Sequence, residues 1–194
     1  MLTFAYGPMN SGKSAQLLKD AFQYSRIGKP AMLFTFDADG EAAPDAVIAS
    51  RMGLQEPAGG FNTATAFSGL VKARLNAGPV GHVFIDEAQF LSAGQVWELA
   101  RISDELDVPV SCFGLRTNFR GEPFAGAVAL MAICDAMREL TAFCHCGRKA
   151  ILNARHGPAG EVLLDGPELD TDKSKYEPVC RVHFRQMAQD PARR

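Results

Sequence analysis

A glycine-rich loop near the beginning of the chain constrains its fold more than any other feature. Residues 7–14 read Gly-Pro-Met-Asn-Ser-Gly-Lys-Ser and fit the pattern G-x-x-x-x-G-K-[ST]. An apolar run at 2–6 precedes the loop and a segment with helical spacing at 13–26 follows it, so we expect a strand, a loop and a helix. In such a loop the backbone N–H groups face bound phosphates, Lys13 supplies a positive charge and Ser14 holds Mg²⁺. A glycine-rich turn with an exposed lysine is the alternative, but pattern and context together favour an ATP or GTP site.

Apolar runs and amphipathic segments alternate after this loop. Continuously apolar runs, typical of strands buried on both faces of a parallel sheet, occur at 31–36, 82–85 and 108–113. Segments with helical spacing occur at 64–76, 93–106 and 125–137. Residues 37–61 are rich in Gly, Ala, Pro and acidic residues, so we expect a long loop there. This order predicts an α/β fold with a mostly parallel sheet flanked by helices.

Length and charge exclude several classes of protein. A chain of 194 residues holds one buried core, or a core with a small appendage, rather than two full-sized domains. Its formal net charge of -2 and pI near 6.1 predict no general attraction to nucleic acid or to an anionic membrane. No apolar segment approaches the roughly 18–20 residues of a membrane helix, and no signal-peptide pattern precedes the loop. We therefore expect a cytoplasmic protein.

Two acidic residues follow the apolar run at 82–85. Because this run is expected to be a buried strand, Asp86 and Glu87 emerge at its carboxyl end, where open α/β sheets bind ligands. The glycine-rich loop opens at the same edge, so Asp86 is a candidate Mg²⁺ ligand and Glu87 lies within reach of an attacking nucleophile. A nucleotide hydrolase would use Glu87 to orient water, whereas a nucleoside kinase would use it to accept a proton from a sugar hydroxyl. The pair alone does not choose between these, and a solvated acidic pair at a strand end is the alternative to both.

Two short clusters near the carboxyl end contain the ligand types of a closed zinc site. They supply three thiols and one imidazole, from Cys144, Cys146, Cys180 and His183. Gly147 suits the tight turn that such a site requires, and His145 is not expected to be a ligand. Reduced cysteines beside an incidental histidine are the alternative. Cys112 and Cys134 lie in apolar runs and are interpreted as small core residues. With no coordination position left for water, the metal is expected to be structural.

Together these motifs resemble one family, the type II thymidine kinases. The resemblance runs nearly end to end, through residues 7–14, 50–54, 85–90, 114–121, 144–150 and 176–184. It implies transfer of the γ-phosphate of ATP to the 5′-hydroxyl of thymidine. It also implies a P-loop (RecA-like) core with a small C-terminal zinc-binding lasso domain. We place the core at 1–140, the lasso domain at 141–185 and a frayed polar tail at 186–194.

The resemblance assigns roles to individual residues. Glu87 matches the base that deprotonates the 5′-hydroxyl, and zinc is implied at the three cysteines and His183. The residues expected to bind ATP are Gly7, Pro8, Met9, Asn10, Ser11, Gly12, Lys13, Ser14, Asp86, Glu87, Ala88 and Gln89. The residues expected to surround the thymine are Met9, Phe90, Leu115, Phe119, Phe124 and Tyr176. Without the resemblance these last six would be ordinary core residues. The family also implies a homotetramer and feedback inhibition by dTTP.

Two stretches depart from the family pattern. Residues 36–41 lack the arginine that usually follows the second strand, and residues 169–173 replace the usual Val-x-Ile-Gly-Gly of the lasso. The second change is expected to alter loop geometry and base preference. Arg116 or Arg120 is a candidate for steadying charge on the transferred phosphate. A related deoxynucleoside kinase of altered base preference is therefore the near alternative.

A nucleic-acid-remodelling ATPase is the alternative from another class. The sequence Asp86-Glu87-Ala88-Gln89 resembles a helicase box, and zinc clusters often bind nucleic acid. Such motors need a second ATPase core that this length does not hold, and the chain has no basic stripe. The sequence therefore favours the kinase.

Overall fold

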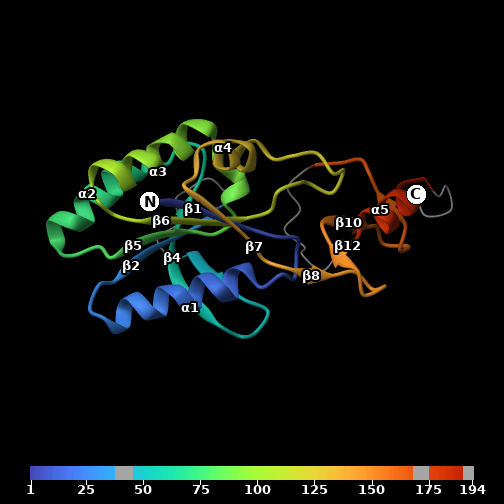
Figure 1. Ribbon diagram of the computed structural model, residues 1–194, viewed down its shortest axis with the longest axis horizontal. Helices are drawn as coiled ribbons and strands as arrows, with labels where there is room; N and C mark the ends of the chain where they lie inside the picture. The colour runs from blue at the N-terminus through green and yellow to red at the C-terminus, as the bar shows by residue number, and fades with distance from the viewer. Residues whose placement is uncertain (38–45, 168–174, 190–194) are drawn as a thin grey trace.

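A seven-stranded sheet forms the larger part of the computed structural model, which describes residues 1–37, 46–167 and 175–189 (Figure 1). Within these ranges the spatial order of its strands is β3-β4-β2-β5-β6-β1-β7. The strands are β1 (Leu2–Tyr6), β2 (Ala31–Phe36), β3 (Ala46–Ala49), β4 (Gln55–Phe61), β5 (His82–Ile85), β6 (Val110–Gly114) and β7 (Ala136–Glu139). All neighbours pair in parallel except β3 and β4. The predicted α/β fold with a mostly parallel sheet is confirmed.

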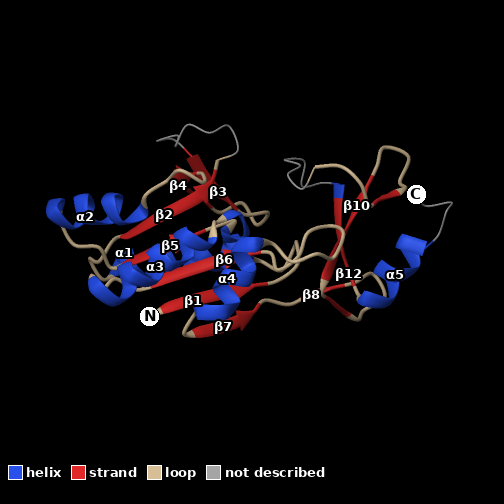
Figure 2. Ribbon diagram, turned by 90° about the horizontal axis from the view of Figure 1, so that it is seen from above, coloured by secondary structure: helices blue, strands red, loops and turns tan. Residues whose placement is uncertain are grey.

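Helices cover both faces of this sheet (Figures 1 and 2). On one face lies α1 (Lys13–Arg26), and on the other lie α2 (Phe67–Ala77), α3 (Ala93–Glu105) and α4 (Ala125–Ile133). The central strand β5 shows why its sequence is apolar throughout. Phe84 packs in the cluster under α1, whereas Val83 and Ile85 pack in the cluster under the other helices. Burial on both faces leaves the strand ends as the polar edge of the fold.

The prediction of a loop over residues 37–61 is wrong for the second half of this range, because β3 and β4 lie there. The composition of β4 does not indicate a strand, because its sequence contains Pro57 and two glycines, which are typical of a turn. Its pairing partners decide its structure instead: its carboxyl half pairs with β2, and its amino half pairs antiparallel with β3. A side chain at Gly59 would lie 3.0 Å from the Phe34 ring, so glycine suits this close approach.

Two helix boundaries also differ from the predictions. Helix α2 begins at Phe67 rather than Ala64, because Asn62 and Thr65 form a local turn. The Asn62 carboxamide oxygen accepts from Ala64 N–H, and the Thr65 hydroxyl accepts from Asn62 N–H. Helix α4 ends at Ile133 rather than Met137, because residues 136–139 form the edge strand β7. The carboxylate of Asp135 accepts from Leu2 N–H at 2.6 Å and fixes the chain beside β1.

The carboxyl part of the chain has its own small core beyond the end of the large sheet (Figures 1 and 2). Its elements are β8 (Ala142–Phe143), β9 (Lys149–Ala150), β10 (Leu152–His156), β11 (Val162–Leu163), β12 (Tyr176–Val179) and α5 (Arg181–Gln189). The expected frayed tail is wrong over 186–189, because α5 continues there and buries Met187. The division at Leu140 stays a prediction. Residues 38–41 and 169–173, on which the two family departures fall, lie outside the described residues.

None of the described helices has both the length and the apolar character that crossing a bilayer requires.

Candidate active site

The glycine-rich loop connects β1 to α1, as the sequence predicts. Gly12 has φ +80°, a left-handed conformation that glycine adopts without strain, and it stands directly before the first turn of α1. The ammonium of Lys13 donates to the carbonyls of Gly7 at 3.0 Å and Pro8 at 2.9 Å. These contacts hold the positive charge over the loop. Loop N–H groups, a helix N-terminus and a lysine are thus arranged as a phosphate site requires.

Ser14 and Asp86 meet at this edge, although 72 positions separate them in the chain. The Ser14 hydroxyl donates to Asp86 Oδ2 at 2.8 Å. Asp86 directly follows β5 and is buried, and its N–H donates to the Phe34 carbonyl at 2.8 Å. A hydroxyl oxygen and a carboxylate oxygen side by side are the ligand types that Mg²⁺ prefers. The pair therefore fits the predicted magnesium site.

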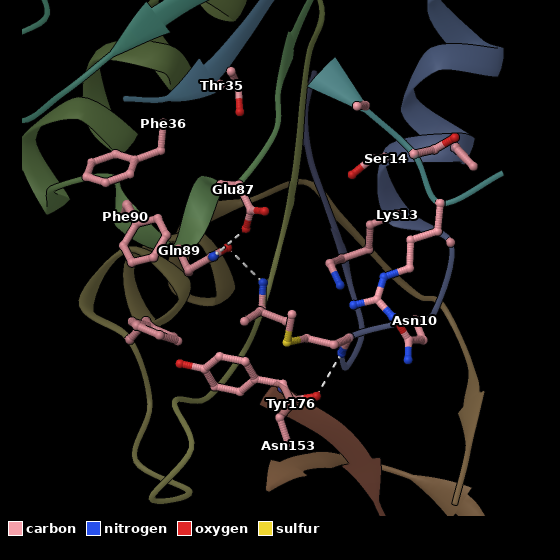
Figure 3. Close-up of a pocket in the computed structure, with 18 of the residues that line it drawn as sticks. Asn10, Lys13, Ser14, Thr35, Phe36, Glu87, Gln89, Phe90, Asn153 and Tyr176 are labelled. Atoms are coloured by element: carbon pink, nitrogen blue, oxygen red, sulfur yellow. Dashed lines mark hydrogen bonds between the residues drawn. The ribbon is translucent and has the colours of Figure 1, made fainter. Parts of the chain in front are cut away.

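A side-chain brace holds Glu87 (Figure 3). Glu87 has φ +53°, a left-handed conformation that is uncommon outside glycine. Its Oε2 accepts a hydrogen bond of 2.7 Å from Gln89 Nε2, and Gln89 Oε1 accepts one of 2.9 Å from Leu115 N–H. A side chain at Gly114 would lie 2.7 Å from Gln89 Oε1, so this approach requires glycine. The brace fixes both ends of the Gln89 amide and thereby the direction of the Glu87 carboxylate.

A cavity of about 690 Å³ is lined by residues of the glycine-rich loop, by Glu87 and by Asn153 and Tyr176 from the carboxyl part of the chain. Its volume is in the range of small-molecule sites. In Figure 3, Lys13 and Asn10 lie on one side of the cavity and Phe36 and Phe90 on the other, with Glu87 between them. All six residues predicted to surround the base line it: Met9, Phe90, Leu115, Phe119, Phe124 and Tyr176.

Aromatic rings form one wall of this cavity. The Phe36 and Phe90 rings lie 4.4 Å apart, and the Phe90 and Phe124 rings meet edge to face at 5.6 Å. Tyr176 approaches from β12, in the carboxyl part of the chain. A flat, apolar slot with carboxylate and ammonium groups at one end suits a nucleoside next to a phosphate donor.

Some predicted residues do not line the cavity. Of the expected ATP set, the residues outside its lining are Gly7, Pro8, Ser11, Asp86 and Ala88. Ala88 is fully buried in the main core instead.

Neither Arg116 nor Arg120 reaches the lining: Arg116 lies 5.6 Å from the Tyr6 ring centroid, and Arg120 forms an ion pair with Glu122 at 2.8 Å. Arg51 does line the cavity, on a segment that the family resemblance included without a role.

Two residues of β10 that the sequence reasoning missed contact the site. Asn153 is buried, lines the cavity, and accepts a 2.8 Å hydrogen bond from Met9 N–H in the glycine-rich loop. Arg155 is also buried, with its guanidinium carbon 3.7 Å from the centroid of the Phe119 ring. Arg155 donates to the carbonyls of Asp165 and Pro167 as well. No sequence signal marks either residue, because both contacts depend on how the two parts of the chain fold together.

The predicted metal-binding side chains come together in the carboxyl part of the chain. The ligand atoms of Cys144, Cys146, Cys180 and His183 all lie within 4.8 Å of one another. Cys144 Sγ and His183 Nδ1 are 3.2 Å apart, and the sulfurs of Cys146 and Cys180 are 4.0 Å apart. Tetrahedral zinc holds such atoms roughly 3.5–3.8 Å apart. This Cys₃His set therefore fits zinc with little movement.

The other residues of this cluster and the remaining cysteines agree with their predicted roles. His145 turns its Nδ1 to Glu177 Oε1 at 2.8 Å, and this hydrogen bond raises the pKa of His145. Its ring stacks on that of His183 at 4.3 Å, so it lies beside the four candidate ligands rather than among them. Burial raises the pKa of both Cys112 and Cys134, which is expected of unreactive core thiols.

Known proteins similar to this chain point to one family. The family description "Thymidine kinase" matches residues 1–184. A thymidine kinase of Jannaschia sp. (strain CCS1) is 42% identical over 190 residues, covering 97% of each chain. One from Ruegeria pomeroyi is 42% identical over 191 residues, covering 98% of this chain and 96% of its own. One from Rhodopirellula baltica is 38% identical over 186 residues, covering 95% and 88%. The chain belongs to the thymidine kinase family.

Proposed function

We propose that this kinase transfers the γ-phosphate of ATP to the 5′-hydroxyl of thymidine with Glu87 as the general base. The observation that carries the proposal is that one cavity contains the Glu87 carboxylate, the Lys13 ammonium and an aromatic slot. A base must lie within hydrogen-bond reach of the proton that it accepts. The brace from Gln89 holds the Glu87 carboxylate in one direction before substrate binds. The hydroxyl of a nucleoside in the slot would then meet the carboxylate on one side and the phosphate on the other.

On the phosphate side, catalysis is positioning and charge stabilisation. The loop N–H groups and Lys13 would hold the triphosphate, whose oxygens would replace the Gly7 and Pro8 carbonyls as partners of the ammonium. Ser14 and Asp86 would hold Mg²⁺, which neutralises developing charge on the phosphates. Arg51 lines the cavity and is our candidate for a second cationic contact, in place of Arg116 and Arg120.

On the nucleoside side, the aromatic wall and Met9 would sandwich the base, and Tyr176 would cover it from the lasso. Stacking on rings recognises a flat pyrimidine without selecting its substituents. Base preference must therefore come from polar groups at the ring edge. Residues 169–173, which depart from the family pattern, contribute to this preference in our proposal.

Other properties rest on the resemblance to the family. We propose that zinc is structural, holding 144–146 to 180–183, because four protein ligands leave no open coordination position. We also propose magnesium dependence, a homotetramer, feedback inhibition by dTTP and a cytoplasmic location. The nucleic-acid-remodelling ATPase is not favoured, since the family match covers residues 1–184.

A nucleoside panel tests the reaction. Thymidine, deoxyuridine, deoxycytidine and deoxyguanosine are incubated separately with ATP and Mg²⁺, and monophosphate formation is measured. We expect thymidine to give the highest kcat/KM. Hydrolysis of ATP that nucleic acid stimulates, without any nucleoside monophosphate, would contradict the proposal.

Substitution of Glu87 tests the base. Because general-base catalysis contributes about 10²–10⁴-fold, Glu87→Gln should lower kcat by that order while the affinity for ATP stays within about twofold. The matched control is Glu105→Gln, on the exposed side of α3. It removes the same charge far from the cavity and should leave kcat unchanged. Equal kcat values for the two variants would rule out the role of Glu87.

A further inference from the structure

The two ends of the Asn153 carboxamide, Oδ1 and Nδ2, point in different directions. Asn153 lies on β10, yet its Oδ1 accepts from the Met9 N–H of the glycine-rich loop at 2.8 Å. A backbone N–H can only donate, so this contact fixes the orientation of the amide, with the oxygen toward Met9. Nδ2 must therefore point away from the loop. Figure 3 shows Asn153 directly below Tyr176, with the dashed contact to the loop.

The Nδ2 group of Asn153 has donor capacity to spare. Across residues 1–37, 46–167 and 175–189, the structure gives Nδ2 no hydrogen-bond partner. Nor is Nδ2 sealed inside the protein: the fully buried side-chain atoms without partners in these ranges are Ser11 Oγ, His82 Nδ1 and Arg155 Nε. Asn153 itself is only 3% exposed and lines the large cavity with Met9, Phe119 and Tyr176. An amide donor at the wall of an aromatic slot suits the edge of a bound base.

We propose that Asn153 determines specificity for the base, with Nδ2 donating to the O4 carbonyl of the pyrimidine. This inference rests on the proposed function, since it takes a nucleoside in the aromatic slot as given. In an anti nucleoside the C5–C6 edge of the ring lies on the side of the 5′-carbon, and O4 adjoins C5. Asn153 is hydrogen-bonded to the phosphate loop, so it faces this edge rather than O2. A donor there accepts thymine and uracil, which carry a 4-oxo group, and rejects cytosine, which carries a 4-amino donor.

The same side chain would also tie base recognition to the phosphate loop. Oδ1 accepts from the loop at Met9, while Nδ2 donates to the base. Binding of a 4-oxo base would therefore fix the amide, and the fixed amide would in turn hold the loop in place. Substitution by aspartate separates these two tasks. An aspartate oxygen still accepts from Met9 N–H, but the second oxygen is an acceptor in place of the amide donor.

The test measures kcat/KM for thymidine and for deoxycytidine at about pH 8 in the full chain. Asn153→Asp should lower kcat/KM for thymidine by about tenfold, because the free-energy cost of losing the hydrogen bond and leaving the O4 carbonyl unpaired corresponds to a change of this size. The same substitution should raise kcat/KM for deoxycytidine. The KM for ATP should stay within about twofold, because the Met9 contact is kept. The matched control is Asn76→Asp, at an exposed position of α2, which should change neither the kcat/KM for thymidine nor that for deoxycytidine.

Asn153→Ala keeps the proposal testable if the aspartate variant does not fold. It removes the donor without adding a charge, so the ratio of thymidine to deoxycytidine kcat/KM should fall by about fivefold or more, and the KM for ATP should rise as Met9 loses its partner. An unchanged nucleoside ratio in the variant that folds would overturn the inference. If the wild-type chain phosphorylates no nucleoside, the proposed function fails instead, so the two failures are distinguishable.

Discussion

The brace on Glu87 yields the most demanding prediction. Gln89 is 3% exposed, and both ends of its amide are hydrogen-bonded, to Glu87 Oε2 at 2.7 Å and to Leu115 N–H at 2.9 Å. Gln89→Leu keeps the size of the side chain and removes both bonds. A hydrogen bond to a charged group contributes about 1.5–3 kcal/mol, and a buried unpaired N–H costs about 1–3 kcal/mol. We therefore expect the free energy of unfolding to fall by about 2–4 kcal/mol.

Catalysis should suffer beyond this loss of stability. Without Gln89 the Glu87 carboxylate loses the hydrogen bond that fixes its direction, while its backbone keeps the left-handed conformation. A base that populates its productive direction only part of the time loses much of its 10²–10⁴-fold contribution, so kcat should fall by roughly 10–100-fold. The KM for ATP should change less than kcat, because the contacts of Lys13 and Ser14 do not involve Gln89, although the family resemblance places Gln89 in the expected ATP set.

Gln95→Leu is the matched control for this experiment. Gln95 is a second buried glutamine, whose amide bonds Ser92 and the carbonyls of Asn62 and Thr65, outside the cavity lining. Its substitution should lower stability by a similar amount and leave kcat unchanged when both variants are assayed well below their melting temperatures. If Gln89→Leu retains the kcat of Gln95→Leu, Gln89 contributes only to stability and our reasoning on the brace is refuted.

Two further predictions concern stability. Burial, followed by the positive N-terminus, lowers the pKa of His82 from 6.5 to about 4. Between these pH values His82 is protonated in the unfolded chain and neutral in the folded chain. The free energy of unfolding should therefore fall by up to about 3 kcal/mol as the pH drops from 6.5 to 4. Denaturant titrations across this range should show a larger loss of stability in wild type than in His82→Phe, because the other titrating groups are common to both proteins; equal losses would contradict the assignment. Elemental analysis should find one zinc per chain, and a strong chelator should lower the melting temperature by an amount that added zinc restores. His183→Ala should weaken zinc binding; a chain without zinc, or one that chelators leave unaffected, would contradict the site.

Local patterns predicted the elements around the phosphate loop because those elements are specified locally. Helix α1 begins at Lys13 and ends at Arg26, as its spacing indicates, since the loop fixes its start and Gly28 follows its end. Strand β4 was missed because its glycines and Pro57 contradict strand propensity, and only pairing with β2 and β3 explains it. Tertiary contacts override local preference in such a strand.

The candidate site divides in the same way. Lys13, Ser14 and Glu87 were predictable because motif spacing and the end of a buried strand bring them to one edge. Asn153 was not predictable, because its contact with Met9 spans 144 positions and joins two parts of the fold. The direction of Nδ2 depends on which group donates to its oxygen. No spacing rule contains that information.

The most direct test of the account is a crystal structure of the protein with thymidine and a non-hydrolysable ATP analogue. We predict that a Glu87 carboxylate oxygen lies within about 2.6–3.2 Å of the thymidine 5′-oxygen, with the γ-phosphate group on the opposite side of that oxygen. A Glu87 side chain turned away from the nucleoside, beyond reach even through one water molecule, would contradict the central claim.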